Sequence, residues 1–146
     1  MARFLVQSTL ILVVFIAAWR IGGKPERLVA SIYATMLLAS TCYALLGGAD
    51  ADADYSDLHG FRFLLDLLAL AGVVIVALSY DRWWTLWVGS VQFIAVMPHL
   101  LRMADVPLEP IVYAIMERWP VWIAVGITGF GTFLHSQRAK AMTCSA

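Results

Sequence analysis

The chain has 146 residues, of which 62% are hydrophobic and 14% are charged, and its formal net charge is zero. A globular domain carries about 45–50% apolar and about 25% charged residues, so a soluble fold of this length could not bury so much apolar surface. The composition excludes a soluble domain, a disordered chain and a basic nucleic-acid-binding protein, and it indicates a membrane protein.

Apolar segments long enough to cross a membrane follow one another along the chain. Crossing about 30 Å of hydrocarbon takes roughly 20 mostly apolar residues per helix. Gly22-Gly23 ends the first segment, Pro25 suits the first turn of the next helix, and an acidic loop at 49–60 precedes the third. The first four predicted spans cover residues 4–21, 28–46, 61–79 and 83–101.

The last segment, residues 110–135, allows two interpretations because Pro120 interrupts it. Proline removes a backbone hydrogen bond, which predicts either one helix with a kink near 120 or a short interfacial helix, 110–118, before a separate span. Both interpretations give about five crossings. The predicted fold is therefore all-α: a single transmembrane helical bundle over residues 1–146.

The Lys and Arg residues predict the orientation of this bundle. Cytoplasmic loops carry an excess of these residues, and most of them fall on one side if the N-terminus lies outside. That side holds Arg20, Lys24, Arg27, Arg82, Arg138 and Lys140, whereas the other holds Arg3, Arg62, Arg102 and Arg118. We therefore expect the C-terminus in the cytoplasm and the protein in the bacterial inner membrane.

Two polar stripes point to a candidate site: His59, Arg62 and Asp66 on the third helix, and Gln92, His99 and Arg102 on the fourth. A charge inside a membrane costs at least about 2.5–3.5 kcal/mol on insertion scales, so such residues need a reason to be there. Residues three, four or seven apart share a helix face, and a short turn makes the third and fourth helices antiparallel neighbours. Both stripes therefore approach the outer end, where the last helix contributes an acid. The candidate ligand or proton site comprises His59, Arg62, Asp66, Gln92, His99, Arg102 and Glu117.

This polar cluster has three interpretations. Arg62 and Asp66 can simply neutralise each other as a salt-bridged helix end, or the cluster can form a functional pocket open to the outer face. A metal held by His59, His99 and Asp66 is the weakest alternative, because these ligands are far apart in the sequence. Haem between two histidines needs deeper ligands than these, so no cofactor is expected.

No catalytic triad, phosphate loop, dinucleotide fingerprint or metalloprotease motif is present in the sequence. The sequence therefore favours a non-enzymatic protein: an accessory or structural subunit of a membrane complex, or a self-associating bundle. The alternatives are a transporter, channel or sensor for a small ion, proton or polar ligand, and then a membrane enzyme or metal site. The expected partners are the lipid bilayer and other membrane subunits or a second copy, with no nucleic acid.

Two short stretches carry a resemblance: residues 19–27, Trp-Arg-Ile-Gly-Gly-Lys-Pro-Glu-Arg, and Asp81-Arg82-Trp83-Trp84 followed by Gln92 and His99-Leu100. They are similar to uncharacterised small multi-span membrane proteins of alphaproteobacteria. The resemblance covers most of the chain and implies an inner-membrane location. It implies no activity and no functional residue.

Overall fold

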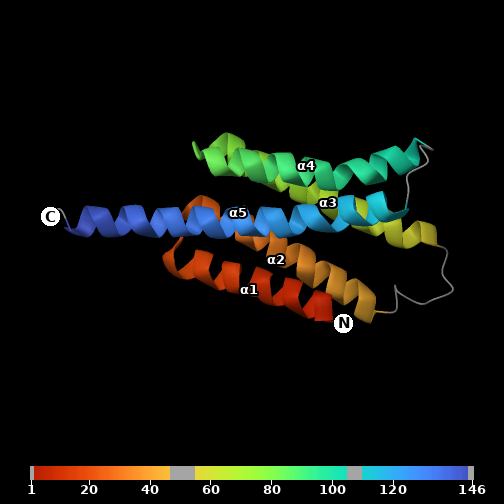
Figure 1. Ribbon diagram of the computed structural model, residues 1–146, viewed down its shortest axis with the longest axis horizontal. Coiled ribbons are helices and arrows are strands. Elements are labelled where there is room, and N and C mark those ends of the chain that lie inside the picture. Colours follow the sequence, from red (N-terminus) through yellow and green to blue (C-terminus); the bar gives the residue numbers. More distant parts are fainter. Residues whose placement is uncertain (1, 47–54, 105–109, 145–146) are drawn as a thin grey trace.

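A computed structural model describes residues 2–46, 55–104 and 110–144, which form helices with no strand among them. Figure 1 shows the helices lying side by side along one long axis, with the C-terminal part of the last helix extending beyond the others. The predicted all-α bundle is confirmed. Its helices are α1 (Ala2–Ile21), α2 (Lys24–Leu45), α3 (Tyr55–Ser79), α4 (Trp83–Met103) and α5 (Pro110–Cys144).

Within the described residues, four helices, α1 to α4, are long and apolar enough to cross a membrane. Helix α5 is not among these four. The fifth crossing therefore stays a prediction, and so does the orientation of the termini. Large apolar side chains such as Leu12, Leu68 and Ile75 are exposed on the outside, where a bilayer would cover them.

Two helices begin earlier than the apolar segments indicate. Helix α2 begins at Lys24, and Pro25 occupies its first turn as predicted. Helix α3 begins at Tyr55, so the prediction of a loop was wrong for residues 55–60. An aspartate in the first turn of a helix is favourable beside the positive end of the helix dipole, so a polar turn can extend a membrane helix into water. The remainder of the predicted acidic loop lies outside the described residues.

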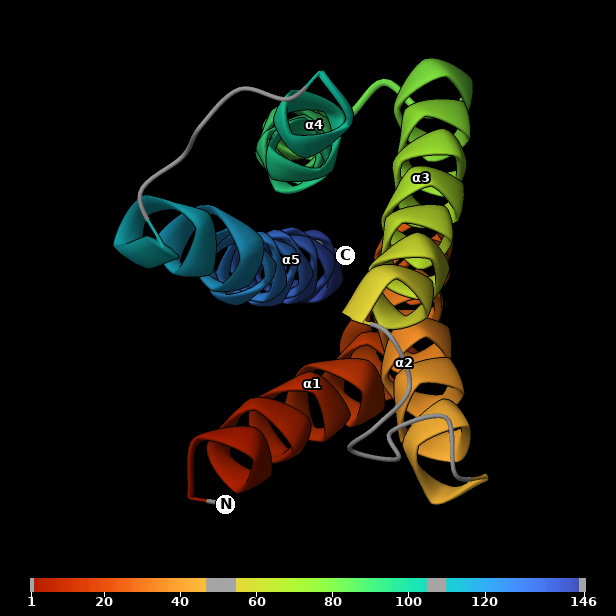
Figure 2. The same ribbon diagram turned by 90° about the vertical axis from the view of Figure 1, so that its right-hand side faces the viewer.

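Helix α5 is continuous from Pro110 to Cys144, so the alternative of a separate interfacial helix was wrong. Pro120 lies inside it, and the N-terminal turns of α5 lean away from the axis of the rest (Figure 2). This lean agrees with the expected kink, since proline lacks the amide hydrogen that would bond to the preceding turn. The helix also continues past the predicted end at residue 135.

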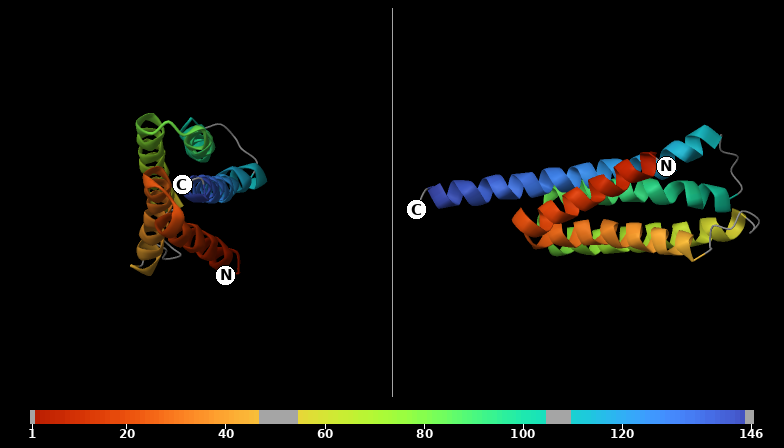
Figure 3. Two further views of the ribbon diagram at one scale, coloured as in Figure 1. Left: turned by 90° about the vertical axis from the view of Figure 1, so that its left-hand side faces the viewer. Right: turned by 90° about the horizontal axis from the view of Figure 1, so that it is seen from below.

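The helices form a closed ring, which Figure 3 shows from two further sides. Each helix packs against the next in the chain, and α5 also contacts α1 and α2. The α1–α2 turn is tight: the Gly22 amide donates to the Ala18 carbonyl at 3.0 Å, and a Cβ on Gly22 would lie 2.6 Å from that oxygen. This turn and the α3–α4 turn lie at the same end of the bundle, which we call the turn end.

The core contains small and β-branched residues from all five helices, with Tyr33 and Trp84 as its largest side chains. Small residues let helices approach closely in a membrane, where van der Waals contact and interhelical hydrogen bonds hold helices together. The buried core comprises Ile11, Val29, Tyr33, Val73, Val76, Trp84, Val88, Ala124 and Val125.

Candidate functional site

Asp66 and His99 meet inside the bundle, from α3 and α4. The Nε2 atom of His99 lies 3.3 Å from Oδ2 of Asp66, and the two side chains are 3% and 13% exposed. The expected contact between these two stripes is therefore present. The contact pairs two ionisable side chains, each of which would otherwise face hydrocarbon at a high cost in free energy.

Gln92 connects this pair to α2. Its side chain is fully buried, and Nε2 donates to both the backbone oxygen and Oδ1 of Asp66, each at 3.3 Å. On its other side, Oε1 accepts a hydrogen bond of 3.0 Å from the hydroxyl of Tyr33. A chain of four polar side chains, His99–Asp66–Gln92–Tyr33, thus joins three helices; we call it the polar cluster.

The polar cluster reaches the middle of the bundle. Gln92 follows the first residue of α4 by nine positions, and Tyr33 follows the first residue of α2 by nine positions. At 1.5 Å per residue, both lie about 13 Å from the turn end, close to the centre of a 30 Å hydrocarbon layer. His99 lies two turns beyond Gln92, so the cluster extends from mid-depth towards the end opposite the turns.

Aromatic side chains cover the outer part of the polar cluster. The ring of Phe63 lies 5.7 Å from that of His99, tilted by 52°. Tyr43 and Phe61 stack with ring centroids 4.2 Å apart and join α2 to α3. His99 is only 4% exposed although it stands in the last turns of α4.

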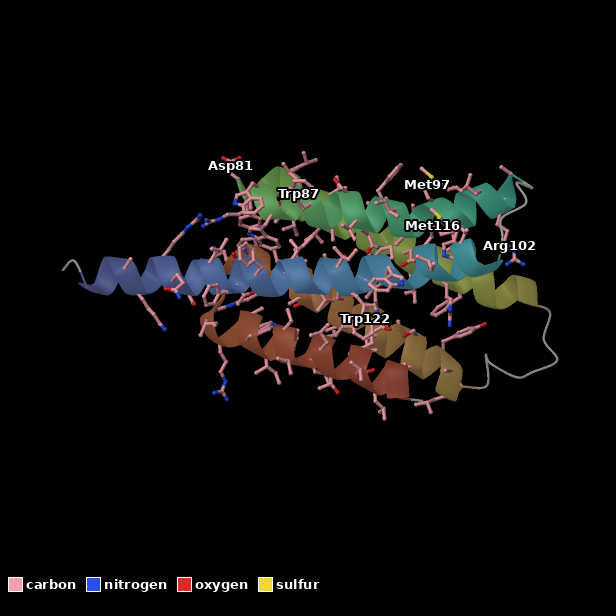
Figure 4. All side chains as sticks on the ribbon, in the orientation of Figure 1. Asp81, Trp87, Met97, Arg102, Met116 and Trp122 are labelled. Atoms are coloured by element: carbon pink, nitrogen blue, oxygen red, sulfur yellow. The ribbon has the colours of Figure 1, made fainter. Side chains whose placement is uncertain are left out.

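Arg62 and Arg102 are exposed, unlike the members of the polar cluster. Arg102 lies at the end of α4, away from the turn end (Figure 4). The side chains of His59 and Glu117 fall outside what the structure describes. A ligand or proton role for the predicted residues therefore stays a prediction. Among the described side chains, no three His, Cys, Asp or Glu residues lie close enough together to hold a metal ion.

Tyr33 was missed by sequence reasoning, although its position gave a clue. Tyrosine is enriched at membrane interfaces, where its hydroxyl reaches water, whereas Tyr33 stands near the middle of an apolar segment. A tyrosine at that depth needs a protein partner for its hydroxyl. Only the tertiary arrangement, in which α2 and α4 both pack against α3, reveals that Gln92 is this partner.

Comparison with protein-family models, curated proteins and solved structures gave no match.

The side chains between Tyr33 and the turn end pack tightly. A crevice bounded by Ile11, Val14, Ala30, Val125 and Thr128 is too narrow to admit a water molecule. The Thr128 hydroxyl donates to the Ala124 carbonyl of its own helix at 2.8 Å. This crevice, which Tyr33 also lines, therefore leaves no space for water between the described side chains.

Proposed function

We propose that this chain is a non-enzymatic membrane protein that associates laterally with membrane helices, in the first place those of a second copy. The observation that carries the proposal is the outward face of α2. Its residues recur at alternating intervals of four and three, the spacing of helices that pack side by side. This face, which we call the α2 seam, comprises Leu28, Ser31, Thr35, Leu38, Cys42 and Leu45.

Small residues of the α2 seam are presented outwards without unpaired hydroxyl groups. Ser31 Oγ donates to the Arg27 carbonyl at 2.7 Å, and Thr35 Oγ1 donates to the Ser31 carbonyl at 2.8 Å. Leu38 projects beyond them with 65% of its surface exposed. Alternating small and large side chains on one face let a second helix approach closely, which is how membrane helices associate.

The polar cluster supports a structural role in the same proposal. Its members contact one another, and Asp66, Gln92 and His99 line neither the narrow crevice nor a second cavity, which lies at the turn end near Glu26 and Trp84. A self-paired network of this kind holds α2, α3 and α4 in one arrangement and so keeps the α2 seam on the outside. The resemblance noted in the sequence adds the proposal of a bacterial inner-membrane location.

Cross-linking at Cys42 tests the association, because this cysteine is free and exposed on the seam. In membranes carrying the Cys144→Ser variant, oxidation should convert the chain to a disulfide-linked dimer through Cys42. The matched control places a single cysteine at Leu64, which is 50% exposed on α3, in a Cys42→Ser/Cys144→Ser background. Replacing Ser31 and Thr35 by isoleucine should abolish the dimer, because bulky side chains keep a second helix away. Equal cross-linking at Cys42 and at the control position, or a monomer in both, would contradict the proposal.

A transporter or sensor is the second candidate, and the buried Asp66–His99 pair favours it. Ionisable residues within a membrane commonly belong to ion or proton pathways. Purified protein in liposomes with an entrapped pH-sensitive dye distinguishes the two candidates. Proton flux that Asp66→Asn abolishes while the protein remains folded would favour transport over a structural role.

A further inference from the structure

A cavity lies at the turn end, where the first turn of α2, the start of α4 and the C-terminal half of α5 meet. Its volume is about 220 Å³, several times the roughly 30 Å³ that a water molecule occupies. Charged and aromatic side chains line it, and the polar cluster does not reach it. The lining includes Glu26, Arg82, Trp84, Gly131, His135 and Arg138.

Glu26 provides the decisive feature of this cavity. The residue is 1% exposed, and its Oε2 atom has no hydrogen-bond partner among the described residues. A buried carboxylate oxygen without a partner is costly, and a hydrogen-bond donor from outside the chain removes that cost. The carboxylate of Glu26 is thus positioned to receive a cation or an N–H group from a ligand.

Two glycines keep this space open. A Cβ on Gly23 would lie 3.0 Å from Oε2 of Glu26 and 3.3 Å from Nδ1 of His135, so both polar groups flank this glycine. A Cβ on Gly131 would lie 2.8 Å from the ring of Trp84. Any larger residue at either position would fill the cavity or displace the groups that line it.

The basic groups lie further out than the carboxylate. Arg138 is exposed and Arg82 is half-buried, whereas Glu26 is enclosed. Among the residues that the structure describes, no carboxylate lies within ion-pair distance of either guanidinium group. Asp81, the other acid of the lining, is exposed and points away from the bundle (Figure 4). The cavity therefore has a negative interior and a positive rim.

We propose that this cavity binds the headgroup of an ethanolamine phospholipid, with the ammonium group against Glu26 and the phosphate against Arg82 and Arg138. A primary ammonium group donates hydrogen bonds to a carboxylate, and arginine binds phosphate in a planar, bidentate manner. The ligand must carry both charges on a short linker, because the interior and the rim belong to one small cavity.

The position of the cavity favours a lipid over a free zwitterion. It lies at the end of the apolar helices, at the depth of headgroups, and the exposed Trp83 borders it. Tryptophan is enriched at that depth. Trp87, one turn further along α4, is 60% exposed and provides an apolar surface for an acyl chain.

Native mass spectrometry of the full chain in mild detergent tests the proposal. The probes are phosphatidylethanolamine, phosphatidylcholine, phosphatidylglycerol and free phosphoethanolamine. We expect phosphatidylethanolamine to bind about tenfold more tightly than phosphatidylcholine, whose methylated ammonium cannot donate a hydrogen bond to Glu26. Glu26→Gln should abolish this preference, and the matched neutralisation Asp81→Asn should preserve it.

A second pair of variants tests the rim without disturbing the interior. Arg138→Gln should weaken binding of phosphatidylethanolamine about tenfold, whereas Lys140→Gln, at an exposed position outside the cavity, should not. Both variants change only exposed side chains, so folding is preserved even if Glu26→Gln fails to fold. Equal binding by wild type and Arg138→Gln, or no preference for the primary amine, would overturn the proposal. Free phosphoethanolamine that displaces the lipid at equal concentration would overturn the assignment to a lipid.

Discussion

Replacing Gln92 by methionine removes the central link of the polar cluster while conserving length and volume. The variant leaves the Tyr33 hydroxyl without its acceptor and Oδ1 of Asp66 without its donor. Each buried polar group that loses its partner costs about 1–3 kcal/mol. Gln92 is fully buried, so water cannot replace the lost contacts. We therefore expect Gln92→Met to lower the free energy of unfolding by at least about 2 kcal/mol.

Tyr33→Phe makes this prediction a double-mutant cycle. Alone, Tyr33→Phe removes one hydrogen bond and leaves only Oε1 of Gln92 without a donor. It should therefore lower the free energy of unfolding by about 1 kcal/mol, within the range of interhelical hydrogen bonds in membranes. In the double variant, no tyrosine hydroxyl remains without an acceptor. Its loss of unfolding free energy should therefore be smaller than the sum of the two single losses by about 0.6–1.7 kcal/mol.

Unfolding in mixed micelles with increasing mole fraction of sodium dodecyl sulfate, followed by circular dichroism, measures these differences. Gln137→Met is the control, because Gln137 is exposed on α5; its effect should stay within about 0.5 kcal/mol. If Gln92→Met also stays within that range, or if the two substitutions are additive, the polar cluster does not hold the three helices together.

Two further predictions concern packing and topology. Gly131→Ala should destabilise the bundle by about 1–3 kcal/mol, because its Cβ would meet the Trp84 ring at 2.8 Å. By contrast, Gly126→Ala, which meets nothing within 4 Å, should be neutral or stabilise by up to about 1 kcal/mol; similar results for both in the same unfolding assay would refute this. A reporter enzyme that is active only in the cytoplasm should be active when fused after Ala146, and activity of a periplasmic reporter there instead would show that the predicted orientation is wrong.

Local properties of the sequence were enough to predict most of the fold. Apolar segment length predicted the helices, Gly22-Gly23 and Pro25 predicted the end of α1 and the start of α2, and helical periodicity put Asp66 and His99 on facing stripes. These features depend on residues only a few positions apart, so the sequence alone is enough to predict them. Helix ends in water were predicted less well, as residues 55–60 show, because the apolar pattern stops where the bilayer does and not where the helix does.

Tertiary structure alone determined which polar groups have partners. The sequence did not reveal that Tyr33 bonds to Gln92, 59 positions away, because this contact depends on how α2 and α4 pack on either side of α3. In the sequence, Glu26 resembles an ordinary acid in the first turn of a helix, and nothing there reveals that its side chain is buried rather than solvated. The crossing of α5 over that turn buries Glu26 beside His135 and leaves its Oε2 unpaired within the described chain. Secondary structure follows from neighbours in the sequence, whereas burial and pairing follow from neighbours in space, and the two candidate sites of this protein depend on the latter.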